Sequence, residues 1–99
     1  MVVKKAAVKS ERSSLKKIQL VTHMDDVHEV VVTGDFTGWS EDGIRLAEEE
    51  EGVWETTLQL APGEYQYRLR VDGEWRDHPE AERRVRNPYG SENCVLTVE

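Results

Sequence analysis

Two of the three tryptophans stand where a flat aromatic ring can reach a ligand. Trp39 lies in a glycine-flanked loop, and Trp75 follows the turn dipeptide Asp72-Gly73. An indole ring can stack on an apolar face of a ligand, which removes water from both surfaces. We therefore expect Trp39 and Trp75 to be ligand contacts. Trp54 begins a strand pattern after an acidic run, so we expect it to be structural.

The residue types that metal binding or catalysis requires are present but poorly arranged. His23 and His28 lack a cysteine partner or a recognisable ligand spacing, so we expect all three histidines, including His78, to lie on the surface and no metal to be bound. Carboxylates are numerous enough for the acid pair of a glycosidase, but a domain of this size offers no deep cleft in which burial raises the pKa of an acid. Cys94 alternates toward the core and is expected to be inert. The sequence predicts neither an enzyme nor a cofactor.

The charge is strongly uneven along the 99 residues, a length that fits one domain. The first 17 residues hold six basic residues and one acid, whereas the rest hold seven basic and 19 acidic residues. The two parts therefore carry +5 and −12, which gives the net charge of −7. An acidic body repels phosphate backbones, so nucleic acid is not an expected partner. We expect residues 1–16 to be a basic flexible arm and residues 17–99 to be the folded domain.

The sequence also suggests a compartment. A single cysteine excludes an intrachain disulfide and favours a reducing environment. No apolar run approaches the roughly 20 residues that span a bilayer, so no membrane association is expected. The Lys, Ser and Ala content of the first residues weakly resembles a transit peptide, but Glu11 argues against one. We expect a cytoplasmic protein.

Hydrophobic alternation indicates strands throughout the expected domain. The clearest case is residues 64–71, where Tyr65, Tyr67, Leu69 and Val71 alternate with polar residues. The expected strands are residues 17–22, 28–33, 44–47, 53–60, 64–71, 74–76 and 94–98. Residues 48–52 are expected to form an acidic turn, and residues 77–86 no regular structure. This pattern predicts an all-β protein, a β-sandwich of seven or eight short antiparallel strands.

Three blocks of the sequence carry a family resemblance. They are residues 34–40 (GDFTGWS), residues 63–75 (GEYQYRLRVDGEW) and residues 87–93 (NPYGSEN). In this order they resemble carbohydrate-binding module family 48, which includes the glycogen-binding domain of the AMP-activated protein kinase beta subunit and the N-terminal domains of isoamylase and branching enzyme. The resemblance covers about residues 17–99 and implies an immunoglobulin-like early-set sandwich that binds α-1,4-glucans.

The resemblance also implies a set of sugar-binding residues. By position these are Trp39, Arg68, Trp75, Tyr89, Ser91 and Asn93. Two departures from the family stand out: Arg68 replaces the usual lysine and presents a planar fork, and Thr37-Gly38 replaces a common Asn-Asn pair. For Asn93, the residues alone allow a second role, which is to satisfy backbone groups of a turn.

The function that we expect is therefore non-catalytic binding of glycogen, starch or maltooligosaccharides at a shallow aromatic site. Such a module would bring a partner enzyme or kinase to the polymer. The alternative is a protein-interaction module of the same fold whose sugar site is idle, because the acidic body, the basic arm and the exposed strand edges of such a sandwich also suit docking.

Overall fold

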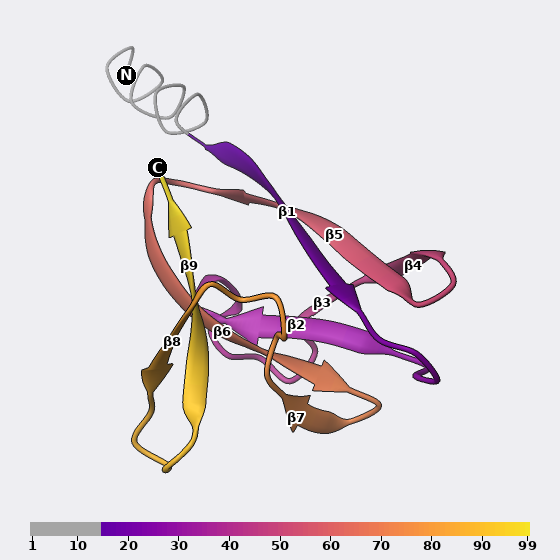
Figure 1. The fold of residues 1–99 in the computed structure, drawn as a ribbon. Helices are drawn as coiled ribbons and strands as arrows, with labels where there is room; N and C mark the ends of the chain where they lie inside the picture. Colours follow the sequence, from indigo (N-terminus) through magenta and orange to yellow (C-terminus); the bar gives the residue numbers. More distant parts are fainter. Residues whose placement is uncertain (1–14) are drawn as a thin grey trace.

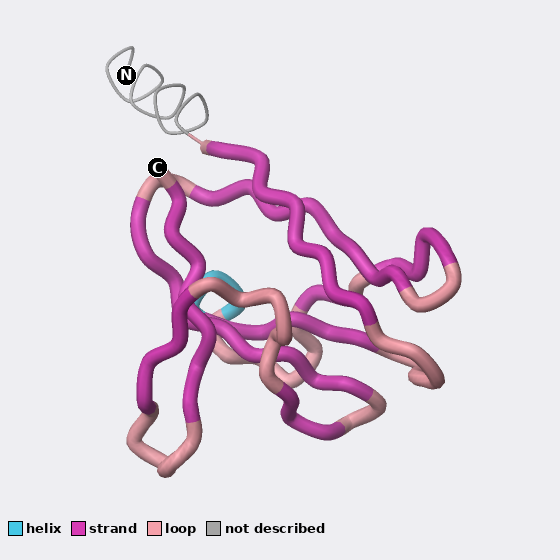
Figure 2. The backbone as a smooth tube through the Cα atoms, viewed as in Figure 1, coloured by secondary structure: helices cyan, strands magenta, loops and turns pink. Residues whose placement is uncertain are grey.

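Residues 15–99, which are those that the structure describes, form two antiparallel β-sheets in a computed structural model of the chain (Figure 1). The strands are β1 (Lys16–His23), β2 (Val30–Gly34), β3 (Ile44–Arg45), β4 (Ala47–Glu50), β5 (Val53–Leu60), β6 (Gly63–Val71), β7 (Glu74–Arg76), β8 (Arg83–Arg86) and β9 (Glu92–Val98). Short turns join them, and one 3₁₀ turn (Asp35–Thr37) is the helical part of this range (Figure 2). The predicted arm, residues 1–16, lies outside the described residues except for its last two.

The two sheets differ in size and share no strand. The smaller has the order β1-β5-β4, and the larger has the order β3-β2-β6-β9-β8, with β7 also paired to β6. Strand β2 pairs with residues 67–71 of β6, and β7 pairs with residues 69–71. A strand has two edges, and β2 occupies one edge of β6 along these residues. Strand β7 therefore pairs along the opposite edge of β6, where β9 pairs with residues 63–67. This arrangement confirms the predicted immunoglobulin-like all-β sandwich.

Strand β6 lies at the centre of the larger sheet and separates the core from the solvent. Its inward side chains Tyr67, Leu69 and Val71 are at most 2% exposed, as their alternation predicted. They pack in a cluster to which both sheets contribute: Leu20, Val30, Val32, Leu46, Trp54, Tyr67, Leu69, Val71 and Cys94. Trp54 is structural, as predicted, because its ring is buried and its Nε1–H donates to the Met24 carbonyl at 3.3 Å.

The expectation that all three histidines lie on the surface is wrong for His78, which is 5% exposed. Its Nε2 lies 2.6 Å from the Val21 carbonyl oxygen, and its Nδ1 lies 2.6 Å from the Tyr67 hydroxyl. A carbonyl only accepts, so Nε2 carries the proton and Nδ1 accepts from Tyr67. The imidazole thus bridges β1 and β6 with both nitrogens bonded, which explains why a polar ring is tolerated there.

Two segments form strands that the sequence did not predict. The acidic run, expected to be a turn at residues 48–52, instead forms most of β4, which pairs with β5 through a register shift between Glu48 and Glu50. All four β4 residues are exposed at a sheet edge, where charged side chains remain hydrated. Residues 83–86, expected to be irregular, pair with β9 as β8. In both cases pairing with a neighbouring strand overrides the local composition. Residues 15–99 thus form nine strands, where seven or eight were expected.

None of the helices formed by residues 15–99 has the length and apolar character that crossing a bilayer requires.

Gly34 ends β2 where that strand lies close to β6, and this contact yields a test of the packing. A Cβ at position 34 would collide with the Gln66 carbonyl oxygen and lie 2.7 Å from the Cα of Tyr67, both of them backbone atoms that cannot move aside. We expect Gly34→Ala to lower the free energy of unfolding by ~1–3 kcal/mol through overpacking. Urea denaturation followed by circular dichroism measures the change. Thr97→Ala, at an exposed strand position, is the control, and equal stabilities for the two variants would contradict this account.

Candidate functional site

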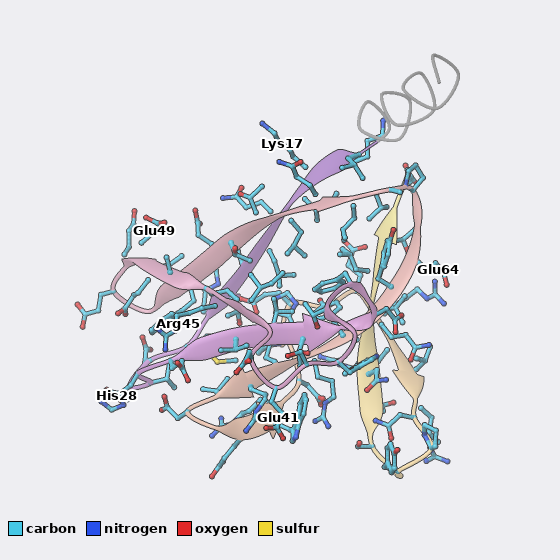
Figure 3. All side chains as sticks on the ribbon, turned by 180° about the vertical axis from the view of Figure 1, so that it is seen from behind. Lys17, His28, Glu41, Arg45, Glu49 and Glu64 are labelled. Atoms are coloured by element: carbon cyan, nitrogen blue, oxygen red, sulfur yellow. The ribbon has the colours of Figure 1, made fainter. Side chains whose placement is uncertain are left out.

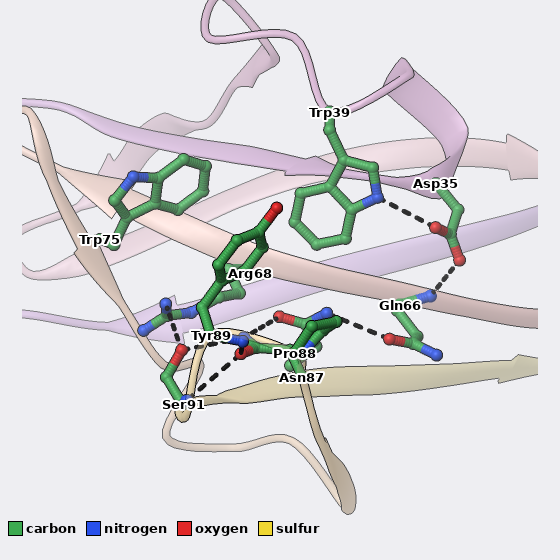
Figure 4. A pocket seen from close by; sticks show the side chains of 10 residues that line it. Asp35, Trp39, Gln66, Arg68, Trp75, Asn87, Pro88, Tyr89 and Ser91 are labelled. Atoms are coloured by element: carbon green, nitrogen blue, oxygen red, sulfur yellow. Dashed lines mark hydrogen bonds between the residues drawn. The ribbon is translucent and has the colours of Figure 1, made fainter.

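The outer face of the larger sheet carries a groove of about 660 Å³ (Figure 4). Its floor is formed by Gln66 and Arg68, which alternate with the buried residues of β6 and therefore point away from the core. The remaining lining comes from four segments that the topology gathers around β6: the loop after β2, strand β7, the turn before β9 and the start of β9 itself. The full lining is Asp35, Trp39, Gln66, Arg68, Trp75, Asn87, Pro88, Tyr89, Ser91 and Asn93.

Trp39 enters the groove from the loop that follows β2. Gly38 and Trp39 both take the left-handed backbone conformation, with φ of 65° and 59°. The Trp39 backbone N–H donates to the Gly34 carbonyl at 3.0 Å, which closes the loop on itself. The side chain is anchored at its polar edge, because the indole Nε1–H donates to Oδ1 of Asp35 at 3.0 Å. With its edge bonded and the residue 37% exposed, the ring keeps an aromatic face available to a ligand.

Trp75 enters the groove from β7, directly after the Asp72-Gly73 turn. It pairs across the strands with Arg70, so both side chains lie on the outer face of the sheet. The guanidinium carbons of Arg70 and Arg68 lie 5.3 and 5.9 Å from the centroid of the indole ring, within cation–π distance. Trp75 is 45% exposed. The two guanidinium groups therefore support the ring, and exposed ring surface remains for a ligand.

Arg68, a cation in the groove lining, is largely buried, with 18% of its side chain exposed. Its bonds are long: Nη2 lies 3.3 Å from Oδ1 of Asp77, and Nη1 lies 3.5 Å from Oγ of Ser91. Its Nε is buried and has no partner among the described residues. The free Nε–H is costly but closed to a ligand, whereas the long bonds of Nη1 and Nη2 leave these two groups able to donate to an incoming oxygen.

The turn at residues 87–91 is organised by one side chain, Asn87. Its Oδ1 accepts from the backbone N–H groups of Tyr89 at 2.9 Å and Ser91 at 3.2 Å. Its Nδ2 lies 2.9 Å from Oγ of Ser91 and 3.1 Å from Oδ1 of Asn93. Asn93 in turn donates to Oε1 of Gln66 at 3.0 Å. This network ties the turn to the floor of the groove and leaves the Tyr89 side chain projecting at its tip, 92% exposed.

The structure brings together all six residues that the resemblance implied: Trp39, Arg68, Trp75, Tyr89, Ser91 and Asn93. The alternative role for Asn93 belongs to Asn87, since Asn87 is the residue that bonds the turn backbone and Asn93 bonds side chains. Sequence reasoning missed Asp35, Gln66, Asn87 and Pro88 as lining residues. An asparagine directly before Pro-Tyr-Gly was a usable signal for the turn, whereas the Asp35–Trp39 bond depends on a loop shape that the sequence does not reveal.

The charged side chains that line the groove, Asp35 and Arg68, are engaged in hydrogen bonds and an ion pair. Among residues 15–99, no three His, Cys, Asp or Glu side chains are placed to hold a metal ion. Asp77 forms an ion pair with Arg68 rather than with an acid, base or nucleophile. Cys94 is fully buried, and burial is the main cause that raises the pKa of its thiol. The arrangement suits binding: aromatic faces on the walls and hydrogen-bonding groups on the floor.

Comparison with known proteins gives the family context. The model of a family described as the glycogen recognition site of AMP-activated protein kinase matches residues 19–99. Protein FLOURY ENDOSPERM 6, chloroplastic, of Oryza sativa subsp. japonica is 36% identical over 86 residues, which are 87% of this chain and 16% of that protein.

Two proteins of Arabidopsis thaliana are also similar. Protein PTST homolog 2, chloroplastic, is 37% identical over 70 residues, 71% of this chain and 13% of that protein. Phosphoglucan phosphatase LSF1, chloroplastic, is 27% identical over 90 residues, 91% of this chain and 15% of that protein. The chain thus spans only 13–16% of the length of these curated relatives.

These relatives correct the expected location. All three are chloroplastic, which contradicts the expectation of a cytoplasmic protein and points to a plastid. The error has a physical origin, because a lone cysteine indicates only that the environment is reducing and does not distinguish one reducing compartment from another. The first residues weakly resemble a transit peptide, although Glu11 argues against one. These residues lie outside the range that the structure describes.

The buried thiol of Cys94 allows a test of the sandwich around it. Because its pKa is raised and its Sγ accepts from the His78 backbone N–H at 3.4 Å, the reactive thiolate is scarce and shielded in the folded protein. We expect a disulfide reagent at pH 8 to label the chain no faster than it unfolds, and completely in concentrated urea. Mass spectrometry over time measures the labelling. Rapid labelling of the native protein would show that the core opens locally at β9.

Proposed function

Because the chain belongs to carbohydrate-binding module family 48, through its match to the glycogen recognition site of AMP-activated protein kinase, we propose that its groove binds an α-1,4-glucan between Trp39 and Trp75. The observation that carries the proposal is the pairing of two part-exposed indole rings, each held in place by charged neighbours, over a floor of hydrogen-bonding side chains. A glucan has the complementary surface, with apolar C–H faces and a polar rim.

Each part of the groove has a role in this proposal. The indole rings and Tyr89 cover the C–H faces of successive glucose units, and they come from three segments, so the aromatic surface is not one flat plane. Arg68 donates to sugar hydroxyls from Nη1 and Nη2, whose bonds to Ser91 and Asp77 are long. Ser91 and Asn93 lie beside it and offer hydroxyl and amide groups already oriented by Asn87. Neutral sugars need no charged site, so the acidic body does not oppose binding.

The binding of one short oligosaccharide should be weak. An open groove buries little ligand surface and orders several side chains, which places the expected dissociation constant at roughly micromolar to millimolar. Strong retention on a polymer then requires many sites on one glucan or several modules in one protein. The chloroplastic relatives favour starch over glycogen as that polymer.

The partner is the second part of the proposal. Each relative is several times longer than this chain, and one is named a phosphoglucan phosphatase. A domain of this kind attached to, or bound by, an enzyme of glucan metabolism would raise the concentration of that enzyme at the polymer surface. We therefore propose such an enzyme as the partner. If the groove is idle, the alternative is that this domain is itself a protein docking module of the same fold.

Single substitutions of the two groove tryptophans test the site. We expect Trp39→Ala and Trp75→Ala each to weaken maltoheptaose binding by at least about tenfold, because each removes one stacking surface at the centre of the groove. Isothermal titration calorimetry measures the binding, and circular dichroism checks the fold.

The control for this test is His28→Ala, which removes an exposed ring outside the groove lining and should leave the affinity unchanged. If folded wild-type protein binds neither maltoheptaose nor starch granules, the groove is idle and the docking function gains support. Unchanged affinity in both tryptophan variants would instead place the sugar site elsewhere on the domain.

A further inference from the structure

The orientation of Trp39 depends on a residue outside the set that the family resemblance implied. Asp35 lies at the start of the loop, four residues before Trp39, and its carboxylate has two partners. Oδ1 accepts from the indole Nε1–H of Trp39 at 3.0 Å, and Oδ2 accepts from the backbone N–H of Gln66 at 2.7 Å (Figure 4). One carboxylate therefore links the loop-borne ring to the central strand of the sheet.

The position of this carboxylate follows from where β2 ends. The ladder between β2 and β6 stops at Gly34 opposite Tyr67, so the preceding residue of β6, Gln66, has no β2 partner. Asp35 directly follows Gly34 and bonds the Gln66 N–H in place of a further strand residue. Because β6 is also paired along its other edge with β9, this oxygen is anchored to a strand that has partners on both edges, and the other oxygen transmits that constraint to Trp39.

Trp39 needs such an anchor. Its backbone has φ of 59°, a conformation that bulky residues seldom adopt, and it follows Gly38, whose φ is 65°. A loop of this kind fixes the direction of the Cβ but leaves rotation about the two side-chain torsions. A hydrogen bond at the far edge of the indole restricts both torsions at once. Without it, the ring would sample other rotamers and present its face to the groove only part of the time.

We propose that Asp35 is a positioning residue for glucan binding, which holds the indole of Trp39 in its binding orientation through the Nε1–H···Oδ1 bond. This inference rests on the proposed function and assigns Asp35 a role through Trp39 rather than through the sugar. It differs from a direct role, which the position of Asp35 in the groove lining also permits, because a residue that acts through the indole N–H has no effect when that N–H is absent.

A double-mutant cycle separates the two roles. The variants are Asp35→Ala, Trp39→Phe and the double variant, each titrated with maltoheptaose by calorimetry. Phenylalanine keeps an aromatic face but has no N–H to bond. We expect Asp35→Ala to weaken binding about five- to tenfold in the wild-type background, as for the loss of one typical hydrogen bond, and less than twofold in the Trp39→Phe background.

Other outcomes of the cycle overturn the proposal. An equal loss in both backgrounds would show that Asp35 acts on the sugar or on the fold, not through Trp39. No loss in the wild-type background would show that the bond does not matter for binding. Asp42→Ala, which removes another exposed carboxylate near the same loop, is the matched control and should leave the affinity unchanged. Asp35→Asn keeps one acceptor oxygen for two donors and should fall between wild type and Asp35→Ala.

An NMR measurement without ligand keeps this inference distinct from the proposed function. The three indole N–H resonances of the ¹⁵N-labelled chain are assigned by substitution. We expect the Trp39 resonance to exchange slowly with water in the wild type and faster in Asp35→Ala, while the Trp54 resonance stays in place as a check on the fold. An unchanged Trp39 resonance would refute the positioning role even if sugar binding is lost. An altered resonance in a protein that binds no maltoheptaose would refute the proposed function alone.

Discussion

The structure depends on the alternation of side chains along β6. A strand places successive residues on opposite faces, so one sequence of nine residues must serve an apolar interior and a polar groove at the same time. Tyr67, Leu69 and Val71 anchor the core. On the other face, Gln66 and Arg68 form the floor of the groove, and Arg68 and Arg70 support Trp75. A shift of one residue in pairing would exchange the two faces and destroy both. The site and the core are therefore fixed by the same register.

Polar side chains fix the parts of the structure that strand pairing leaves free. On the inner side, His78 joins β1 to β6 with both ring nitrogens bonded. On the outer side, Asp35 and Asn87 fix the two loops that carry Trp39 and Tyr89. Each of these residues satisfies backbone or side-chain groups that β pairing leaves free. The aromatic residues can then lie on loops and still be held in place, which reduces the conformational entropy lost when a ligand binds.

The sequence predicted the features that repeat and missed those that depend on the tertiary structure. Alternation over residues 64–71 and the Asp72-Gly73 turn predicted β6, its buried face and the hairpin to β7, because both signals are local. The edge strands β4 and β8 were missed, since their residues are charged and their pairing is decided by the neighbouring strand. The buried His78 was missed for the same reason: its partners Val21 and Tyr67 are distant in sequence. The expected cytoplasmic location was wrong because amino-acid composition does not distinguish one reducing compartment from another.

The edge strand β4 has a consequence for crowding on a polymer. Its residues are exposed, and Figure 3 shows Glu49 at the outer edge of the molecule. Under the proposed function, a glucan would gather many copies of the domain and bring their unpaired sheet edges close together, which is the condition under which strands of different molecules join. The carboxylates along β4 repel the same edge of a neighbouring copy at short range. On the proposed function, the acidic edge would therefore let many copies bind one polymer while each copy keeps its own fold.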